Sequence, residues 1–73
     1  MNYYRFQKLS KEFAKKGKDE YETLNILKEI SDSRKEDEHY MEYLNKITDI
    51  LKKYGIKGID ADFLSMKIAG IIK

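Results

Sequence analysis

The stretch YMEYLNKITDILKKY, residues 40–54, carries the clearest helical pattern in the chain. Apolar side chains recur in it at spacings of three and four residues, at Tyr40, Leu44, Ile47, Leu51 and Tyr54. This is the period of one face of an α-helix, and the opposite face carries acid-before-base pairs four residues apart that favour an exposed helical surface. Because such a helix must bury its apolar face against other elements, the stretch predicts a helical domain.

Working outward from this stretch, turn and cap residues divide the chain into four helices. Gly17 and Gly55 suit the left-handed position that follows a helix, and Asp19 and Asp60 suit the N-cap position that precedes one. Ile59 is placed to pack against the first turn of the last helix as a hydrophobic staple. We expect one all-α domain over residues 1–73, a small antiparallel bundle of four short helices over residues 3–16, 20–31, 34–54 and 61–72.

Each of the other three helices has an apolar stripe that we expect to fill the core. The second should be the most buried, because its apolar residues cover more than half of its circumference. The expected core residues are Tyr3, Phe6, Leu9, Phe13 and Ala14 in the first helix, Tyr21, Leu24, Ile26, Leu27 and Ile30 in the second, and Phe63, Leu64, Ile68, Ile71 and Ile72 in the fourth. Met66 is expected at the side of the fourth stripe.

The segment SDSRKEDE, residues 31–38, has no apolar residue and allows two interpretations. In one, the chain turns here, and Ser33 with Glu36 three residues later forms a capping box that starts the third helix. In the other, a single helix continues through a solvated stretch. We favour the turn, because a continuous helix would leave two middle turns with nothing to bury.

The length of 73 residues and the absence of cysteine limit how this domain is stabilised. A core of this size leaves little margin over the entropy cost of folding, and disulfides and thiolate metal sites are excluded. We therefore expect stabilisation by self-association, as a homodimer, or by a partner. The chain has no apolar run long enough to span a membrane and no signal-peptide pattern at its start, so we expect a soluble, cytoplasmic protein.

The net charge of +2 conceals a basic, acidic, basic order along the chain. The first helix carries a row of basic residues with one aromatic among them, a pattern that can contact phosphates and stack on a base or can simply solvate the outer face. Tyr43 and Tyr54 lie at the edge of the third stripe, and tyrosine is common in protein interfaces. The candidate partner-binding residues are Tyr4, Arg5, Lys8, Lys11, Lys15, Tyr43 and Tyr54.

Two segments bear a partial resemblance to known families. The run RKEDEHYMEYL, in which Glu36 precedes His39 by three residues, resembles one helix of ferritin-like proteins. That resemblance implies a di-iron site, but the pattern occurs once instead of twice, so only a symmetric dimer could complete it. The stretch LKKYGIKGIDADFLSMKI is similar to a helix-hairpin-helix or helix-turn-helix unit, which implies phosphate contacts by the turn. Lys57 interrupts the glycine pattern, and Asp60 and Asp62 would repel phosphate; ordinary helix capping explains the same residues.

No catalytic pattern accompanies these features. The chain has no cysteine nucleophile and no glycine-rich phosphate loop, and its carboxylates lie in solvated runs where nothing shifts their pKa towards acid–base work. We therefore expect no enzyme activity, no cofactor and no metal. The sequence favours a regulator or inhibitor that binds another macromolecule, a protein first and a nucleic acid through the basic face of the first helix as the alternative.

Overall fold

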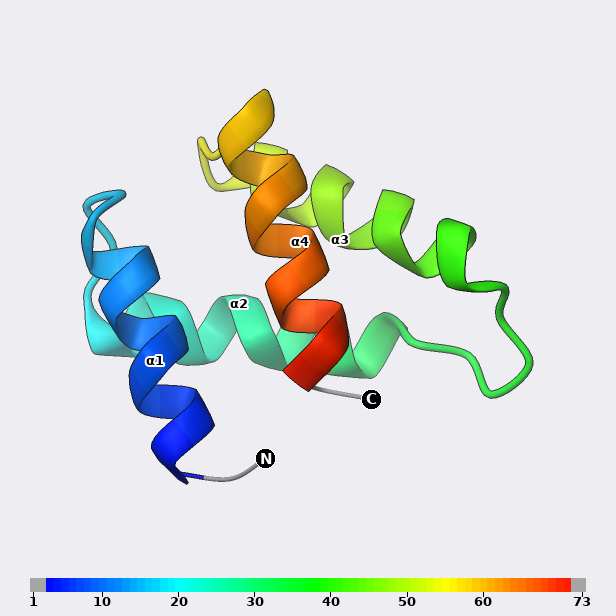
Figure 1. Ribbon diagram of the computed structural model, residues 1–73, viewed down its shortest axis with the longest axis horizontal. Coiled ribbons are helices and arrows are strands. Elements are labelled where there is room, and N and C mark those ends of the chain that lie inside the picture. The colour runs from blue at the N-terminus through cyan, green and yellow to red at the C-terminus, as the bar shows by residue number, and fades with distance from the viewer. Residues whose placement is uncertain (1–2, 72–73) are drawn as a thin grey trace.

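Four α-helices make up the part of the chain that the computed structural model describes, residues 3–71 without the side chain of Ile71 (Figure 1). No strand occurs among these residues. Neighbouring helices in the chain pack together, and the last helix closes back on the first, so that α1 and α4 lie side by side. The expected all-α bundle of four short helices is confirmed. Its helices are α1 (Tyr3–Ala14), α2 (Glu20–Ser33), α3 (Tyr40–Lys53) and α4 (Ile59–Ile71).

The glycine stops after α1 and α3 form as the sequence predicts. Gly17 and Gly55 have φ values of +81° and +87°, in the left-handed region. After α3 the amide of Ile56 donates to the carbonyl of Leu51 at 2.9 Å, and the amide of Gly55 donates to Lys52 at 3.0 Å. This is the Schellman pattern, which satisfies the last carbonyls of the helix and turns Ile56 back into the core, where it is 3% exposed.

The start of α2 is also as expected, but the start of α4 is not. Asp19 caps α2, with its carboxylate accepting from the amide of Glu22 at 2.8 Å. Before α4, Gly58 takes a left-handed φ of +69° and its carbonyl accepts from the amide of Asp62, so the helix begins at Ile59. The predictions of Asp60 as N-cap and of Ile59 as a staple are wrong, because both residues already lie in the helix and Ile59 is 71% exposed.

The chain does turn between the second and third helices, but the capping box at Ser33 is wrong. α2 continues through Ser33, whose hydroxyl donates to the carbonyl of Ile30, and α3 begins only at Tyr40. His39 is the N-cap of α3, with its Nδ1 accepting from the amide of Met41 at 3.1 Å. Tertiary contacts anchor the connection. Lys46 donates to the carbonyl of Ser33 at 3.1 Å and pairs with Glu38, whose side chain is 3% exposed.

The core lies inside the ring of helices and takes residues from all four and from Ile56. Several side chains expected inside are exposed, because each helix contacts only its two neighbours in the ring and so buries a narrower stripe than a helix covered on all sides. The buried hydrophobic residues are Leu9, Phe13, Ile26, Leu27, Ile30, Tyr43, Ile47, Leu51, Ile56, Ala61, Leu64, Ile68 and Ala69. The exposed residues that were expected in the core are Tyr3, Ala14, Tyr21, Leu24, Tyr40 and Phe63. Met66, expected at the side of its stripe, is exposed as well. Ile72 lies outside the described residues, and so does the predicted end of the last helix.

Candidate interaction surface

A groove between α1 and α4 gathers three of the predicted partner-binding residues. Lys8, Lys11 and Lys15 follow one another at spacings of three and four, which places them along one side of α1. α4 contributes a fourth basic residue, Lys67, which sequence reasoning did not select. The groove has a volume of about 540 Å³, and the residues that line it are Lys8, Leu9, Lys11, Glu12, Lys15, Met66, Lys67 and Gly70.

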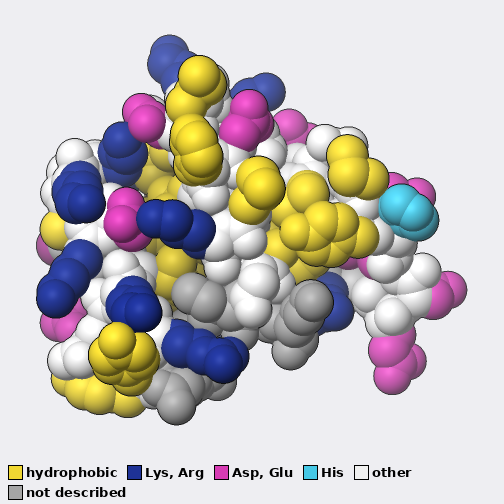
Figure 2. Space-filling view, viewed as in Figure 1, with side chains coloured by type: hydrophobic (Ala, Val, Ile, Leu, Met, Phe, Trp, Pro, Cys, Tyr) yellow, Lys and Arg dark blue, Asp and Glu magenta, His cyan; other side chains and the backbone are white. Residues whose placement is uncertain are grey.

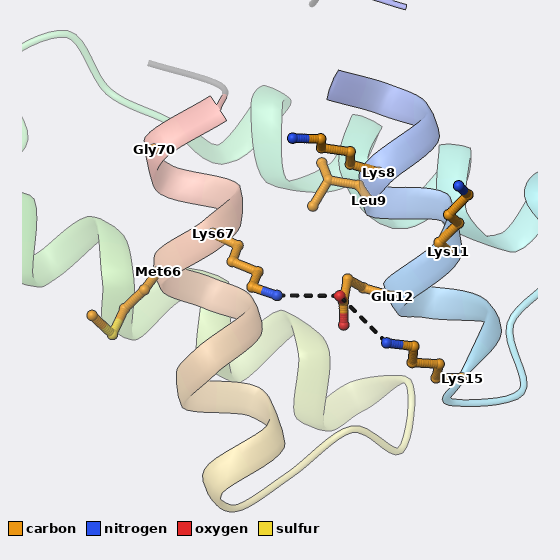
Figure 3. Close-up of a pocket in the computed structure, with 8 residues that line it drawn as sticks. All are labelled: Lys8, Leu9, Lys11, Glu12, Lys15, Met66, Lys67 and Gly70. Atoms are coloured by element: carbon orange, nitrogen blue, oxygen red, sulfur yellow. Dashed lines mark ion pairs between the residues drawn. The ribbon is translucent and has the colours of Figure 1, made fainter. Parts of the chain in front are cut away.

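A single carboxylate, that of Glu12, lies among these lysines (Figure 3). Lys67 reaches it from α4 at 3.2 Å and Lys15 from α1 at 3.7 Å. The hydrogen bond from Lys67 is the main cause that lowers the pKa of Glu12 below its ordinary value. Lys8 lies 4.8 Å from the centre of the Tyr4 ring. Among the described residues no carboxylate forms an ion pair with Lys8 or Lys11, so the groove keeps a positive potential.

The floor of the groove is apolar. Leu9 is 1% exposed and packs into the core behind it, and the aliphatic stems of the lysines line its walls. Gly70 lies at the α4 side without a side chain, and a Cβ built on it would meet no described atom within 4 Å. The groove therefore offers an apolar surface with a basic rim.

The outer side of α4 carries an exposed apolar row that adjoins the groove. Ile59, Phe63 and Met66 stand at spacings of four and three and are 71%, 65% and 57% exposed. Met66 points away from α1 (Figure 3), and with Met41 of α3 it lines a second, smaller hollow of about 200 Å³ between α3 and α4. Figure 2 shows hydrophobic side chains over α4 and α3 beside a lysine-rich region over α1. We call Ile59, Phe63 and Met66 the α4 row.

The predicted tyrosines do not join this surface. Tyr43 is 4% exposed, so the expectation that it is available to a partner is wrong; it packs into the core, and burial raises the pKa of its hydroxyl. Tyr54 is half-buried, and its hydroxyl donates to Glu29 at 2.8 Å, which raises the pKa of Tyr54. The pKa of Glu29 is lowered first by its hydrogen bond from Lys53 and then by the one from Tyr54.

The other two predicted residues lie near the groove without lining it. Tyr4 is 62% exposed, and Arg5 is exposed on α1 one residue later. Neither is among the residues that line the groove. The structure thus brings together Lys8, Lys11 and Lys15 and leaves the remaining predicted residues around or behind them.

A signal for the missed residues was present in the sequence. The last helix has apolar residues on every side, so Phe63 and Met66 could be read as flanking core residues. A helix with apolar residues all round is normally buried all round. Since α4 contacts only α3 and α1, one of its apolar sides has no described neighbour.

The two partial resemblances have no support in the geometry. Glu36 and His39 lie in the non-helical connection and at its end, so they do not project from one helix face. Among residues 3–71 no group of three or more His, Cys, Asp or Glu side chains is placed to hold a metal ion. In the first turn of α4, Asp60 pairs with Lys16 at 2.9 Å, so its contact is with the turn that follows α1.

No family model, curated protein or solved structure matches the chain. No helix in the described part of the chain combines the length and the apolar character needed to cross a bilayer. The function must therefore be argued from the surface itself.

Proposed function

We propose that this chain is a small non-enzymatic binding protein, a regulator or inhibitor that acts in the cytoplasm by covering a surface of another protein. The observation that carries the proposal is the α4 row. Isolated exposed hydrophobic residues are ordinary, but a contiguous row beside a hollow is typical of a contact surface. Aromatic residues and methionine are also enriched where proteins bind one another.

The row is not needed for the fold. The inner side of α4 already supplies Ala61, Leu64, Ile68 and Ala69 to the core, and these are at most 4% exposed. The exposed parts of Phe63 and Ile59 add no hydrophobic stabilisation to the isolated domain, since that stabilisation comes from apolar area removed from water. A role in contact with a partner explains why these positions are apolar.

Nucleic-acid binding is the second candidate, and the observation that favours it is the lysine groove. Phosphates would suit Lys8, Lys11 and Lys15, with Tyr4 and Arg5 beside them. Two features favour a protein instead: Ile59 and Met66 of the α4 row have no charge or hydrogen-bond donor for a phosphate, and Asp60 and Asp62 place negative charge at the start of α4. Retention on DNA or RNA that falls steeply with salt would favour the second candidate.

A homodimer is a further proposal, because a second copy could cover the same row. The mass in solution separates the two occupants. A monomer at micromolar concentration leaves the row to another protein, whereas a dimer that is broken by Phe63→Asp assigns the row to self-association.

Photo-crosslinking tests the proposal directly. Phe63 is replaced by a photoreactive phenylalanine analogue and the protein is irradiated in an extract of its native host. Tyr21 on α2, which is 73% exposed, receives the same analogue as the matched control. We expect a discrete adduct from position 63 and none from position 21. Excess unmodified protein should prevent formation of this adduct by competing for the partner, whereas excess Phe63→Asp should not.

Three results would count against the proposal. These are no adduct at position 63, the same set of adducts at both positions, and an adduct of the protein with itself alone.

A further inference from the structure

We propose that the groove between α1 and α4 receives an acidic amphipathic helix of the partner protein. This inference rests on the proposed function and names the chemistry of the partner segment. The groove and the α4 row are continuous through Met66, which lines the groove and belongs to the row. One partner can therefore contact both.

Charge complementarity identifies the occupant. Four lysines, Lys8, Lys11, Lys15 and Lys67, surround one glutamate, and that glutamate already binds two of them. Lys8 and Lys11 have no carboxylate partner among residues 3–71. An occupant that supplies carboxylates would form ion pairs with Lys8 and Lys11, and a basic or neutral occupant would not.

The shape of the groove favours a helix. Two helices bound it, and along α1 the lysines extend from residue 8 to residue 15, which at 1.5 Å per residue is roughly 10 Å, about two helical turns. Carboxylates three and four residues apart on a partner helix would match the same spacing in Lys8, Lys11 and Lys15. The apolar side of that helix would lie on the aliphatic stems of the lysines, with the buried Leu9 behind them, as helices dock in other apolar grooves.

Gly70 supports a groove that must stay open. Glycine within a helix is less stable than alanine, because it loses more conformational freedom on folding. No described atom lies within 4 Å of the position of its missing Cβ, so the core does not require glycine there. A side chain at this position would instead occupy the groove.

The apolar floor argues against a nucleic acid as the occupant. A nucleic acid would need aromatic faces for stacking, whereas none of the described residues that line the groove is aromatic and the nearby ring of Tyr4 lies under the ammonium of Lys8. Oligonucleotide binding is accordingly an outcome of the test that would overturn the inference.

The probe is a synthetic Leu/Glu amphipathic peptide of about 15 residues, the length at which an isolated helix becomes marginally stable. It carries one tryptophan, which is excited selectively at a wavelength that tyrosine does not absorb, since the protein has tyrosines but no tryptophan. Three comparison ligands are a Leu/Gln peptide of the same pattern, a Leu/Glu peptide of scrambled order, and a single-stranded oligonucleotide. Binding is measured at several salt concentrations.

Three protein variants locate the binding site. Lys8→Glu with Lys11→Glu reverses the free groove charges, and Lys28→Glu with Lys57→Glu makes the same change in net charge at exposed lysines outside the groove. We expect the groove pair to weaken binding of the Leu/Glu peptide about tenfold, which corresponds to 1.4 kcal/mol, and the control pair to change it less than about twofold. Gly70→Leu, which keeps every charge, should also weaken binding about tenfold while the protein stays folded.

The inference is overturned if the Leu/Gln or the scrambled peptide binds as tightly as the Leu/Glu peptide, or if both lysine pairs have equal effects. It is also overturned if Gly70→Leu has no effect, if the oligonucleotide binds more tightly than the peptide, or if no peptide binds. Each of these results leaves the crosslink from position 63 intact, so failure here is distinguishable from failure of the proposed function.

Discussion

Phe63 and Ile68 lie on opposite sides of α4, and substituting each by alanine separates the surface role of this helix from its structural role. Ile68 is 0% exposed, and an Ile→Ala change at such a site costs about 2–5 kcal/mol. A 73-residue domain has a total stability of roughly 4–11 kcal/mol, so Ile68→Ala removes a large part of it. At about 4–8 °C per kcal/mol for this size, Tm should fall by about 10 °C or more.

Phe63→Ala should behave differently, because Phe63 is 65% exposed and is not one of the buried core residues. An exposed substitution of this kind changes stability by less than about 0.5 kcal/mol, so Tm should move by less than about 4 °C. Thermal unfolding followed by circular dichroism measures both variants, with Ile68→Val as a milder core variant if Ile68→Ala fails to fold.

The comparison is repeated at a low and a high protein concentration, because a dimer has a Tm that rises with concentration. A large loss of Tm in Phe63→Ala would refute the reasoning that the outer side of α4 is unpacked. If that loss grows with protein concentration, the row is buried against a second copy.

Three further results follow from the helix ends and the ion pairs. Gly55→Ala should lower the urea midpoint, with a cost of about 1 kcal/mol or more, because alanine is strained at a φ of +87°. Asp19→Ala should cost about 0.5–2 kcal/mol in the same assay through loss of the N-cap. Lysine partners lower the pKa values of Glu12, Glu29 and Glu38. The stabilisation from these ion pairs is therefore present above the ordinary pKa of 4.5 and is lost as the pH falls through the lower pKa values of the folded state. The urea midpoint should decrease when the pH is lowered below about 4.5, and it should decrease less in Glu38→Gln.

Helix number and most helix ends could be predicted because they depend on local chemistry. Gly17 and Gly55 end helices through a backbone conformation that glycine adopts without strain, and Asp19 starts one through a hydrogen bond to a residue three positions on. These signals need no tertiary partner. The core residues Ile47 and Leu51 were predictable for a similar reason, since their helix has a single apolar stripe.

The ends that were mispredicted depend on tertiary contacts. Ser33 stays helical at the end of α2, where its carbonyl accepts from Lys46, thirteen residues later. The same lysine holds Glu38 in the connection, which leaves His39 to cap α3. A capping box at Ser33 has the correct local pattern, but a pattern of four residues does not report a contact between two helices.

The candidate site was predictable only in part. The lysines of α1 form a visible row, but the groove also needs Lys67, and nothing local to either helix indicates that α4 closes against α1. Tyr43 was mispredicted because tertiary packing buries a residue that the local pattern places at the edge of its stripe. Tyr43 looked like a residue at the edge of its stripe, yet the packing of α3 turns it inward to 4% exposure, where its hydroxyl has no hydrogen-bond partner within the described structure.

The position of the α4 row has a consequence for how binding energy is divided. Leu64 and Ile68 fix α4 from behind, so the backbone that presents Phe63 is already ordered before a partner arrives. Ordering a flexible segment on binding reduces the free energy of association, and a helix that is already formed avoids this cost. The aromatic side chain on it should then act mainly on the dissociation rate, as buried contacts do. The lysines of the groove are long, exposed and charged, so they should act mainly on the association rate and its salt dependence. The two neighbouring surfaces of this helix pair would thus affect different steps of binding. The lysines of the groove would speed association, and the α4 row would slow dissociation.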